Sequence, residues 1–408
     1  MSSPRGTVSG PQRRIAPGLM AALGYVSMGM SLSTDLYLPA FPSIAGDFGV
    51  PAATVQLTLT AVLIGAAFGQ LIIGSISDAL GRRPTLIVAL VLFTACCYLA
   101  TASNSIEMLI AVRAVQGFAG AAGSVLARAV VADLTSRAAA VRAFSTLFVF
   151  VALGPAVASP LGAALTQWGG WRAALLGLAV IATGMLVVTV LFIPESLPRD
   201  QRQPFVVSVL LRNIGGLLRT PPFVAYALAF ATGYAALITY LGSSSFIVQD
   251  VFGLSPLGYA VTFSTTAVSI MAGSWASGRL GVRIGAAPTL RWALVLALLS
   301  AGTLALLAAT GELTLVTYLP LVVAFAIGSG AMLGTASGLA VGQASRTAGA
   351  GSAVVGFTQS AFGAVASPLG GLWGTETAVP ATVVMTVFAL AGLICASTGA
   401  RLAPAGSD

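Results

Sequence analysis

One acidic and one basic residue lie inside long apolar runs of the sequence. Asp35 falls in the run 17–43 and Arg113 in the run 106–132. If these runs are membrane helices, each residue is about seven positions inside the outer end, roughly 10 Å below the surface. A carboxylate in hydrocarbon is costly unless it is paired or protonated. We therefore predict that Asp35 pairs with Arg113 and that Asp35 carries a proton.

The pair has more than one interpretation. A static buried pair, or an Arg113 that bonds only to carbonyl oxygens, would have no transport role. If the pair separates when a substrate arrives, the proton affinity of Asp35 changes and the carboxylate can carry a proton. The chain has no His, so carboxylates and arginines remain for such a relay.

The three cysteines do not suggest a second site. Cys96, Cys97 and Cys395 fall in apolar runs without metal-like spacing. This placement predicts neither a disulfide nor a metal site. We expect no cofactor, with the proton as the coupling ion.

A short charged turn separates two apolar runs near residue 80. It carries Gly74, Asp78, Gly81, Arg82 and Arg83. This spacing resembles the signature loop of the major facilitator superfamily, G-x-x-x-D-x-x-G-R-[RK], which joins the second and third helices of that fold. The resemblance implies a transporter whose cytoplasmic turn docks and undocks during the transport cycle.

We predict that this turn is part of a cytoplasmic gate. Asp78 can accept backbone N–H bonds at the start of the eleventh helix near Ser352, where the helix dipole favours an anion. Arg82 can pair with Asp133 at the end of the fourth helix. The alternative for Arg83 is that it only enforces membrane topology.

Composition identifies the bilayer as the solvent of this chain. Its 408 residues are 57% hydrophobic and 7% charged, with a mean hydropathy of +0.97. Runs of helix length recur throughout. The expected spans are 17–43, 54–77, 84–102, 106–132, 143–165, 172–193, 222–246, 256–278, 287–309, 314–343, 352–372 and 378–400.

The arginines predict the orientation. With both termini in the cytoplasm, all arginines except Arg113 and Arg172 lie on the cytoplasmic side, as the positive-inside rule requires. The first apolar run is too long for a signal peptide. The net charge of +8 therefore reflects topology, and we expect no nucleic-acid partner.

The two halves of the chain repeat one another. The peptide at 157–162, Val-Ala-Ser-Pro-Leu-Gly, recurs unchanged at 365–370. This repeat predicts an N-terminal bundle at 1–194, a cytoplasmic connector at 195–220 and a C-terminal bundle at 221–408. Together with the resemblance, it implies an all-α membrane protein with the major facilitator fold, twelve transmembrane helices in two pseudo-symmetric six-helix bundles.

Prolines and glycines inside the fifth and eleventh helices are candidate kinks. Gly154 and Pro155 partly resemble the antiporter motif of the fifth helix, and Pro160 and Pro368 occupy equivalent positions in the repeat. Close helix packing is the favoured explanation for these small and kinking residues, and control of helix bending during transport is compatible with it.

Two further segments narrow the resemblance. Residues 33–42, Ser-Thr-Asp-Leu-Tyr-Leu-Pro-Ala-Phe-Pro, are similar to the first-helix motif of the Bcr/CflA bicyclomycin-resistance exporters, and residues 349–359 are similar to the motif that opens their eleventh helix. This likeness implies export of bicyclomycin, chloramphenicol-type or sulfonamide drugs against protons.

The same fold predicts which helices line the central cavity. On those helices we name Tyr25, Tyr37, Gln116, Tyr234 and Gln343 as candidates for substrate contact. A tyrosine offers an apolar ring with one hydroxyl, which suits an amphipathic drug, although tyrosine is also common as an interfacial anchor.

The leading hypothesis is a monomeric, proton-coupled exporter of small amphipathic compounds in the bacterial cytoplasmic membrane. The alternative is a proton-coupled or facilitative importer of a small solute on the same fold. An enzyme is disfavoured because the sequence has no His, no Cys-His pair and no paired carboxylates. It has no nucleotide-binding loop either, so ATP is not the expected energy source.

Overall fold

Long apolar helices make up this computed structural model, which describes residues 16–135, 137–202, 214–344, 348–372, 374 and 377–402. Part of the expected connector, 203–213, lies outside the described residues. The helices are α1 (Pro17–Ser27), α2 (Gly29–Asp35), α3 (Phe41–Phe48), α4 (Ala52–Leu80), α5 (Arg82–Thr101), α6 (Ile106–Leu134), α7 (Arg137–Phe192), α9 (Pro221–Phe246), α10 (Pro256–Ile284), α11 (Ala286–Thr310), α12 (Leu315–Gly342), α13 (Ala348–Leu369) and α14 (Val379–Leu402). Short helical turns lie at η1 (Leu38–Ala40), η2 (Arg199–Gln201) and η3 (Ile247–Val251).

These helices are consistent with the twelve expected spans. The first span is broken into α1 and α2 at Met28. α7 contains two spans, which join where Gly169 and Gly170 leave helical geometry. Gly170 has φ 70°, a conformation that glycine adopts without steric cost. Among the described helices, eight are long and apolar enough to cross a bilayer. The chain is therefore a multi-pass membrane protein.

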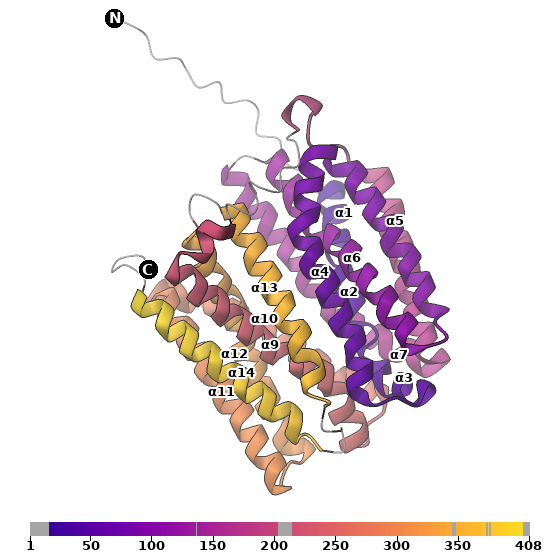
Figure 1. The fold of residues 1–408 in the computed structure, drawn as a ribbon, viewed down its shortest axis with the longest axis vertical. Coiled ribbons are helices and arrows are strands. Elements are labelled where there is room, and N and C mark those ends of the chain that lie inside the picture. Colours follow the sequence, from indigo (N-terminus) through magenta and orange to yellow (C-terminus); the bar gives the residue numbers. More distant parts are fainter. Residues whose placement is uncertain are drawn as a thin grey trace, which may run out of the picture.

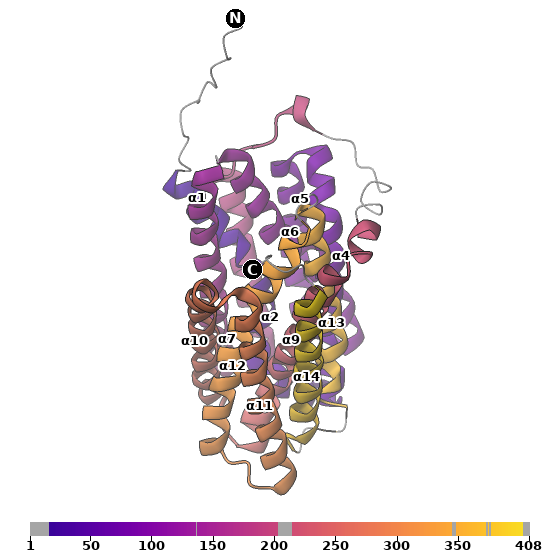
Figure 2. The same ribbon diagram turned by 90° about the vertical axis from the view of Figure 1, so that its left-hand side faces the viewer.

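The helices form two bundles that lie side by side. Figure 1 shows the indigo-to-magenta helices of the first half beside the orange-to-yellow helices of the second, with α13 next to α4. Figure 2 shows helices of both bundles running roughly along the long axis. Each bundle has buried apolar clusters of its own, such as the one around Leu23, Phe93 and Leu126 in the first half.

Glycine contacts repeat between the halves. In the first bundle a Cβ at Gly117 of α6 would overlap the carbonyl oxygen of Val62 on α4. In the second, a Cβ at Gly330 of α12 would overlap the carbonyl oxygen of Ile270 on α10. Both pairs bring two helix backbones into direct contact, as small residues do between membrane helices. The internal repeat therefore extends from sequence to packing.

A seam formed by α4 and η1 of the first half and α9, η3 and α13 of the second joins the bundles toward the end opposite the charged turn. Four side chains donate across the two halves to main-chain carbonyl oxygens at 2.9–3.2 Å: Gln56 to Gly242, Thr60 to Ala364, Gln249 to Pro39, and Ser367 to Gln56. Phe41 and Phe246 add a ring contact of 6.0 Å between centroids. The hydrogen bonds of the described residues thus hold this end of the protein closed.

Candidate functional site

Asp35 is the last residue of α2 and is 5% exposed. Its carboxylate accepts a hydrogen bond from the hydroxyl of Thr34 at 2.9 Å. It also lies close enough to Tyr234 and Tyr259, both in the second bundle, to interact with them electrostatically. Asp35 therefore faces the boundary between the two halves.

Arg113 of α6 is completely buried but does not pair with Asp35 among the ion pairs of the described residues. Its guanidinium donates to the carbonyl oxygen of Ser33 at 2.7 Å, to the Ser33 hydroxyl at 3.1 Å and to Gln116 Oε1 at 2.9 Å. The predicted pair is therefore corrected. Ser33 and Asp35 are two residues apart, roughly 200° around a helix, so Arg113 reaches the face that carries Ser33.

The predicted cavity residues Tyr37 and Gln116 surround Arg113. The guanidinium lies 4.0 Å from the centroid of the Tyr37 ring, and the Tyr37 hydroxyl is 2.5 Å from the hydroxyl of Thr58. Gln116 donates from Nε2 to Cys97 Sγ at 3.0 Å. Both side chains are fully buried. They hold Arg113 in place, and they do not line an open cavity in this structure.

Two other cavity candidates are also placed away from Asp35. The Tyr25 hydroxyl donates to the carbonyl oxygen of Ile181 at 3.0 Å, which fixes its ring against the second span of α7. Gln343 follows the last residue of α12 as its C-cap. Both residues are on or directly after the expected helix, but hydropathy does not predict which way a side chain faces around that helix.

Tyr234 is the candidate that the structure brings close to Asp35. Its ring stacks on Phe230 with ring centroids 6.4 Å apart. Its hydroxyl forms a hydrogen bond with the side chain of Gln359 on α13. Gln359 was missed as a site residue, although it closes the eleventh-helix motif at 349–359. Asp35, Tyr234 and Gln359 thus combine a carboxylate, an aromatic hydroxyl and an amide from three helices.

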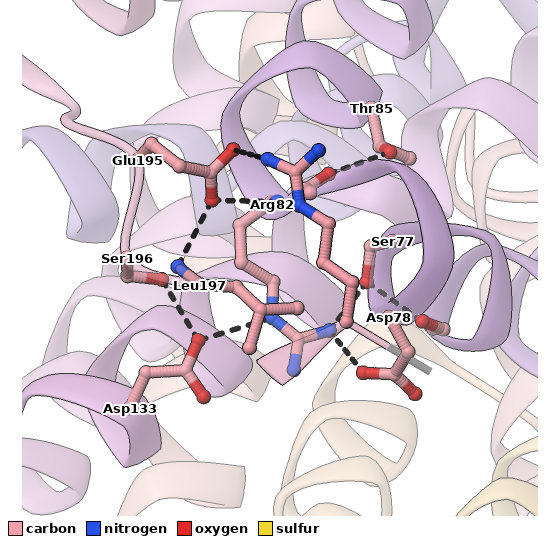
Figure 3. A network of polar contacts seen from close by, with 11 residues as sticks. Ser77, Asp78, Arg82, Thr85, Asp133, Glu195, Ser196 and Leu197 are labelled. Atoms are coloured by element: carbon pink, nitrogen blue, oxygen red, sulfur yellow. Dashed lines mark hydrogen bonds and ion pairs between the residues drawn. The ribbon is translucent and has the colours of Figure 1, made fainter. Parts of the chain in front are cut away.

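The charged turn folds into a compact polar network within the first half (Figure 3). Arg82 contacts Asp78 at 2.5 Å, Asp133 at 3.1 Å and the Ser77 hydroxyl at 2.6 Å. The predicted pair of Arg82 with Asp133 is therefore confirmed. Its role in a gate remains a prediction.

Glu195, which like Gln359 was not predicted as a site residue, completes this network. Its carboxylate accepts from the backbone N–H of Arg82 at 2.9 Å and from Arg202 at 3.4 Å (Figure 3). Gly81 has φ 107°, and a Cβ there would overlap Glu195 Oε2. An acidic residue directly after the sixth span was the available signal. Gly81 is thus needed both for its backbone conformation and for the approach of Glu195.

Among the described residues, Asp78 forms no hydrogen bond with the start of α13, so the expected contact is not found there. Its carboxylate is 50% exposed and its ion pair is with Arg82 of its own bundle. Ser352 is exposed. Contacts between the halves continue from the seam as far as Gln70 of α4, whose amide is 3.5 Å from the Ser360 hydroxyl of α13. Arg83 donates to the carbonyl oxygen of Val190 at 2.8 Å, and a Cβ at Gly74 would meet only ordinary contact with Val125.

The candidate kink residues pack against neighbouring helices. A Cβ at Gly154 would come within 2.9 Å of Ser31 Cβ on α2. Pro155 and Pro160 lie within α7 and Pro368 within α13. The non-helical torsions recorded inside α7 fall at Gly169 and Gly170. The structure therefore supports the packing explanation for Gly154, and a role of the prolines as kinks remains a prediction.

Replacing Glu195 by alanine should destabilise the turn. The buried N–H of Arg82 would lose its acceptor, which costs about 1–3 kcal/mol. A thermal unfolding curve of the purified protein in detergent measures the loss. Glu312→Gln is the matched control, because Glu312 is an exposed residue at the opposite end. An unchanged midpoint for Glu195→Ala would show that the network does not hold the turn.

Comparisons with known proteins agree with this geometry. A model of the Major Facilitator Superfamily matches residues 21–368. An uncharacterized MFS-type transporter, YdgK, from Bacillus subtilis is 33% identical over 92% of both chains. A bicyclomycin resistance protein homolog from Haemophilus influenzae is 29% identical over 90% of this chain and 94% of its own length. Multidrug resistance protein D from Escherichia coli is 31% identical over 72% of both chains.

A solved structure gives the same result for the fold. The xylose transporter XylE from Escherichia coli, in a partially occluded inward-open conformation, superposes with a TM-score of 0.74 at 13% identity, covering 95% of this chain and 97% of its own. Its likeness extends over both bundles. The paired bundles, the charged turn and the family match lead to one conclusion: the chain belongs to the major facilitator superfamily.

Proposed function

We propose that this protein is a proton-coupled efflux transporter that exports small amphipathic antimicrobial compounds from a bacterial cell. It would work as a monomer in the cytoplasmic membrane, with both termini in the cytoplasm. The names of two relatives, a bicyclomycin resistance protein homolog and multidrug resistance protein D, support drug export. The major facilitator fold supports transport by alternating access.

The observation that carries the proposal is the position of Asp35. The carboxylate is buried, has Thr34 as its hydrogen-bond donor, and has no ion-pair partner among the described residues. A buried carboxylate without a cation is stabilised by taking up a proton. Because Asp35 faces the second bundle, rocking of the two bundles would change its surroundings. We infer that Asp35 binds the coupling proton.

Arg113 would act through its position near Asp35. It is held by Gln116 of its own helix, by Ser33 on the face of α2 opposite Asp35, and by the ring of Tyr37. Its buried Nε has no hydrogen-bond partner in the described structure. In a transport state in which the central cavity reaches Arg113, an acceptor group in that cavity could therefore bind this N–H. This arrangement supports a positioning role for Arg113 in proton exchange.

Tyr234, Phe230 and Gln359 support a substrate of mixed character. Two aromatic rings provide apolar contact, and the amide and hydroxyl provide hydrogen bonds. Bicyclomycin, chloramphenicol-type drugs and sulfonamides combine apolar groups with hydrogen-bonding groups, and would match such a site. If one proton is exchanged for a neutral drug, a membrane potential of 100 mV contributes about 2.3 kcal/mol to export.

Drug-triggered proton release in everted membrane vesicles tests the proposal. Vesicles that contain the protein should release protons from an energised lumen when bicyclomycin, chloramphenicol or a sulfonamide is added. Vesicles from cells without the protein provide the baseline. Proton movement of the opposite sign would favour an importer. Release equal to the baseline for every compound would contradict drug–proton antiport.

A further inference from the structure

A cavity of about 580 Å³ lies beside the charged turn, outside the space between the bundles. Its walls are the start of α5, with Arg83, Pro84 and Ile87, and the segment that follows α7, with Glu195, Leu197, Pro198, Arg199 and Arg202. The volume is within the range of about 300–1,000 Å³ that is typical of small-molecule sites. The cavity is large enough for a phosphate-containing headgroup.

The charge of this cavity favours an anion. Three arginines, Arg83, Arg199 and Arg202, face one carboxylate, Glu195. That carboxylate already accepts from the backbone N–H groups of Arg82 and Leu197 at 2.9 and 3.0 Å. The cavity therefore has an excess of positive charge that the described residues do not neutralise.

Two of these arginines also have an unused hydrogen-bond donor. The Nε atoms of Arg83 and Arg202 are buried and have no acceptor in the described structure. The contact of Arg202 with Glu195 is long, at 3.4 Å. A phosphate group matches guanidinium donors in geometry and charge. An anion in the cavity would satisfy donors that the protein leaves open.

The surroundings of the cavity indicate the source of the phosphate. One turn along α5, Val88 and Val91 are 69% and 50% exposed. At the end of α7, Leu191 and Phe192 are 69% and 56% exposed. In a membrane protein these side chains face acyl chains. The cavity thus lies where a basic surface meets an apolar one, which suits a molecule that has both a phosphate and fatty-acid chains.

We propose that this cavity binds the headgroup of an anionic phospholipid from the leaflet on the side of the charged turn. The phosphate pairs with Arg83, Arg199 and Arg202, and an acyl chain lies along the exposed face of α5. Basic pockets at the cytoplasmic ends of membrane helices bind such headgroups. Because Glu195 borders both the cavity and the Arg82 network, the bound lipid also stabilises the turn.

Native mass spectrometry of the full-length protein tests the site. Detergent-solubilised protein is mixed with dioleoylphosphatidylglycerol or with dioleoylphosphatidylcholine. We expect preferential retention of phosphatidylglycerol. At about 1 kcal/mol for each arginine, the double variant R199Q/R202Q should retain it about 30-fold less well. Arg401→Gln is the control, because Arg401 is an exposed arginine at the end of α14 and is not part of the cavity; it should retain the lipid like the wild type.

A single variant and a competition experiment complete the test. Arg199 is exposed, so Arg199→Gln alone should fold even if the double variant does not; it should reduce lipid retention about 5-fold. Equal retention by wild type and Arg199→Gln, or equal binding of the two lipids, would overturn the proposal. So would full displacement of the lipid by millimolar glycerol 3-phosphate, which would assign the cavity to a soluble phosphate compound.

Discussion

Vesicles that carry Asp35→Asn should show no drug-triggered proton release above the level of vesicles without the protein. Asparagine has nearly the same shape as aspartate but cannot bind a proton at physiological pH. It can still accept the hydrogen bond from Thr34. We therefore expect that drug binding, measured by quenching of intrinsic fluorescence, is retained while proton exchange is lost. Asp35→Glu is the matched variant, and it should recover part of the release.

Thermal stability separates this proposal from a buried ion pair. Arg113 donates to Ser33 and Gln116 and, among the described residues, forms no ion pair with Asp35, so Asp35→Asn should leave no new unpaired charge. Removal of one partner of a buried ion pair usually costs about 3–5 kcal/mol. An unchanged unfolding midpoint is expected for Asp35→Asn. A large fall in the midpoint would restore the ion pair, and normal proton release by the variant would remove Asp35 from the transport cycle.

Gly162→Ala should be the most destabilising alanine substitution among the glycines that the structure describes. A Cβ at Gly162 of α7 would overlap the main-chain carbonyl oxygen of Leu36, directly after Asp35. A backbone atom cannot rotate away, so the two helices would have to separate. Overpacking of this kind costs about 1–3 kcal/mol, and more where the backbone must move. Thermal unfolding monitored by size-exclusion chromatography measures the change.

Two matched glycines provide the controls for this prediction. Gly338 of α12 has no neighbour within 4 Å of the position that a Cβ would occupy, so alanine there should be neutral or stabilise the helix by up to about 1 kcal/mol. Gly370 is the repeat equivalent of Gly162, but a Cβ there would meet the hydroxyl of Ser243, a side chain that can rotate. Its substitution should cost less. Equal effects at Gly162 and Gly338 would contradict the packing argument.

The sequence was sufficient for the helices and the repeat because hydropathy reports which segments can cross a membrane. It also predicted the pair of Arg82 with Asp133, since the turn and the end of the fourth span must lie on one side of the bilayer. The depth of a residue in the membrane can be counted from its position along the predicted span. The pairing of Asp35 with Arg113 relied on depth alone.

Rotational phase and long-range contacts account for the remaining differences. Arg113 reaches Ser33 because that residue faces α6, and two positions further on the helix faces the second bundle. The rotation of α1 likewise directs Tyr25 toward Ile181. Glu195 was missed because its main partner is the backbone N–H of Arg82, so the sequence shows its charge but not its partner. Such contacts depend on how the helices are rotated and packed.

The seam has a consequence for the resting populations of the transport states. Its four donors, Gln56, Thr60, Gln249 and Ser367, would contribute together roughly 2–6 kcal/mol at a net value of about 0.5–1.5 kcal/mol for each hydrogen bond. Reversing a two-state equilibrium from 1:99 to 99:1 takes about 5.5 kcal/mol. Because each of the four donates to a main-chain oxygen, the choice of side chain at these positions can adjust the bias between states. The relative populations of the transport states can thus change in evolution without any change in the proton chemistry at Asp35.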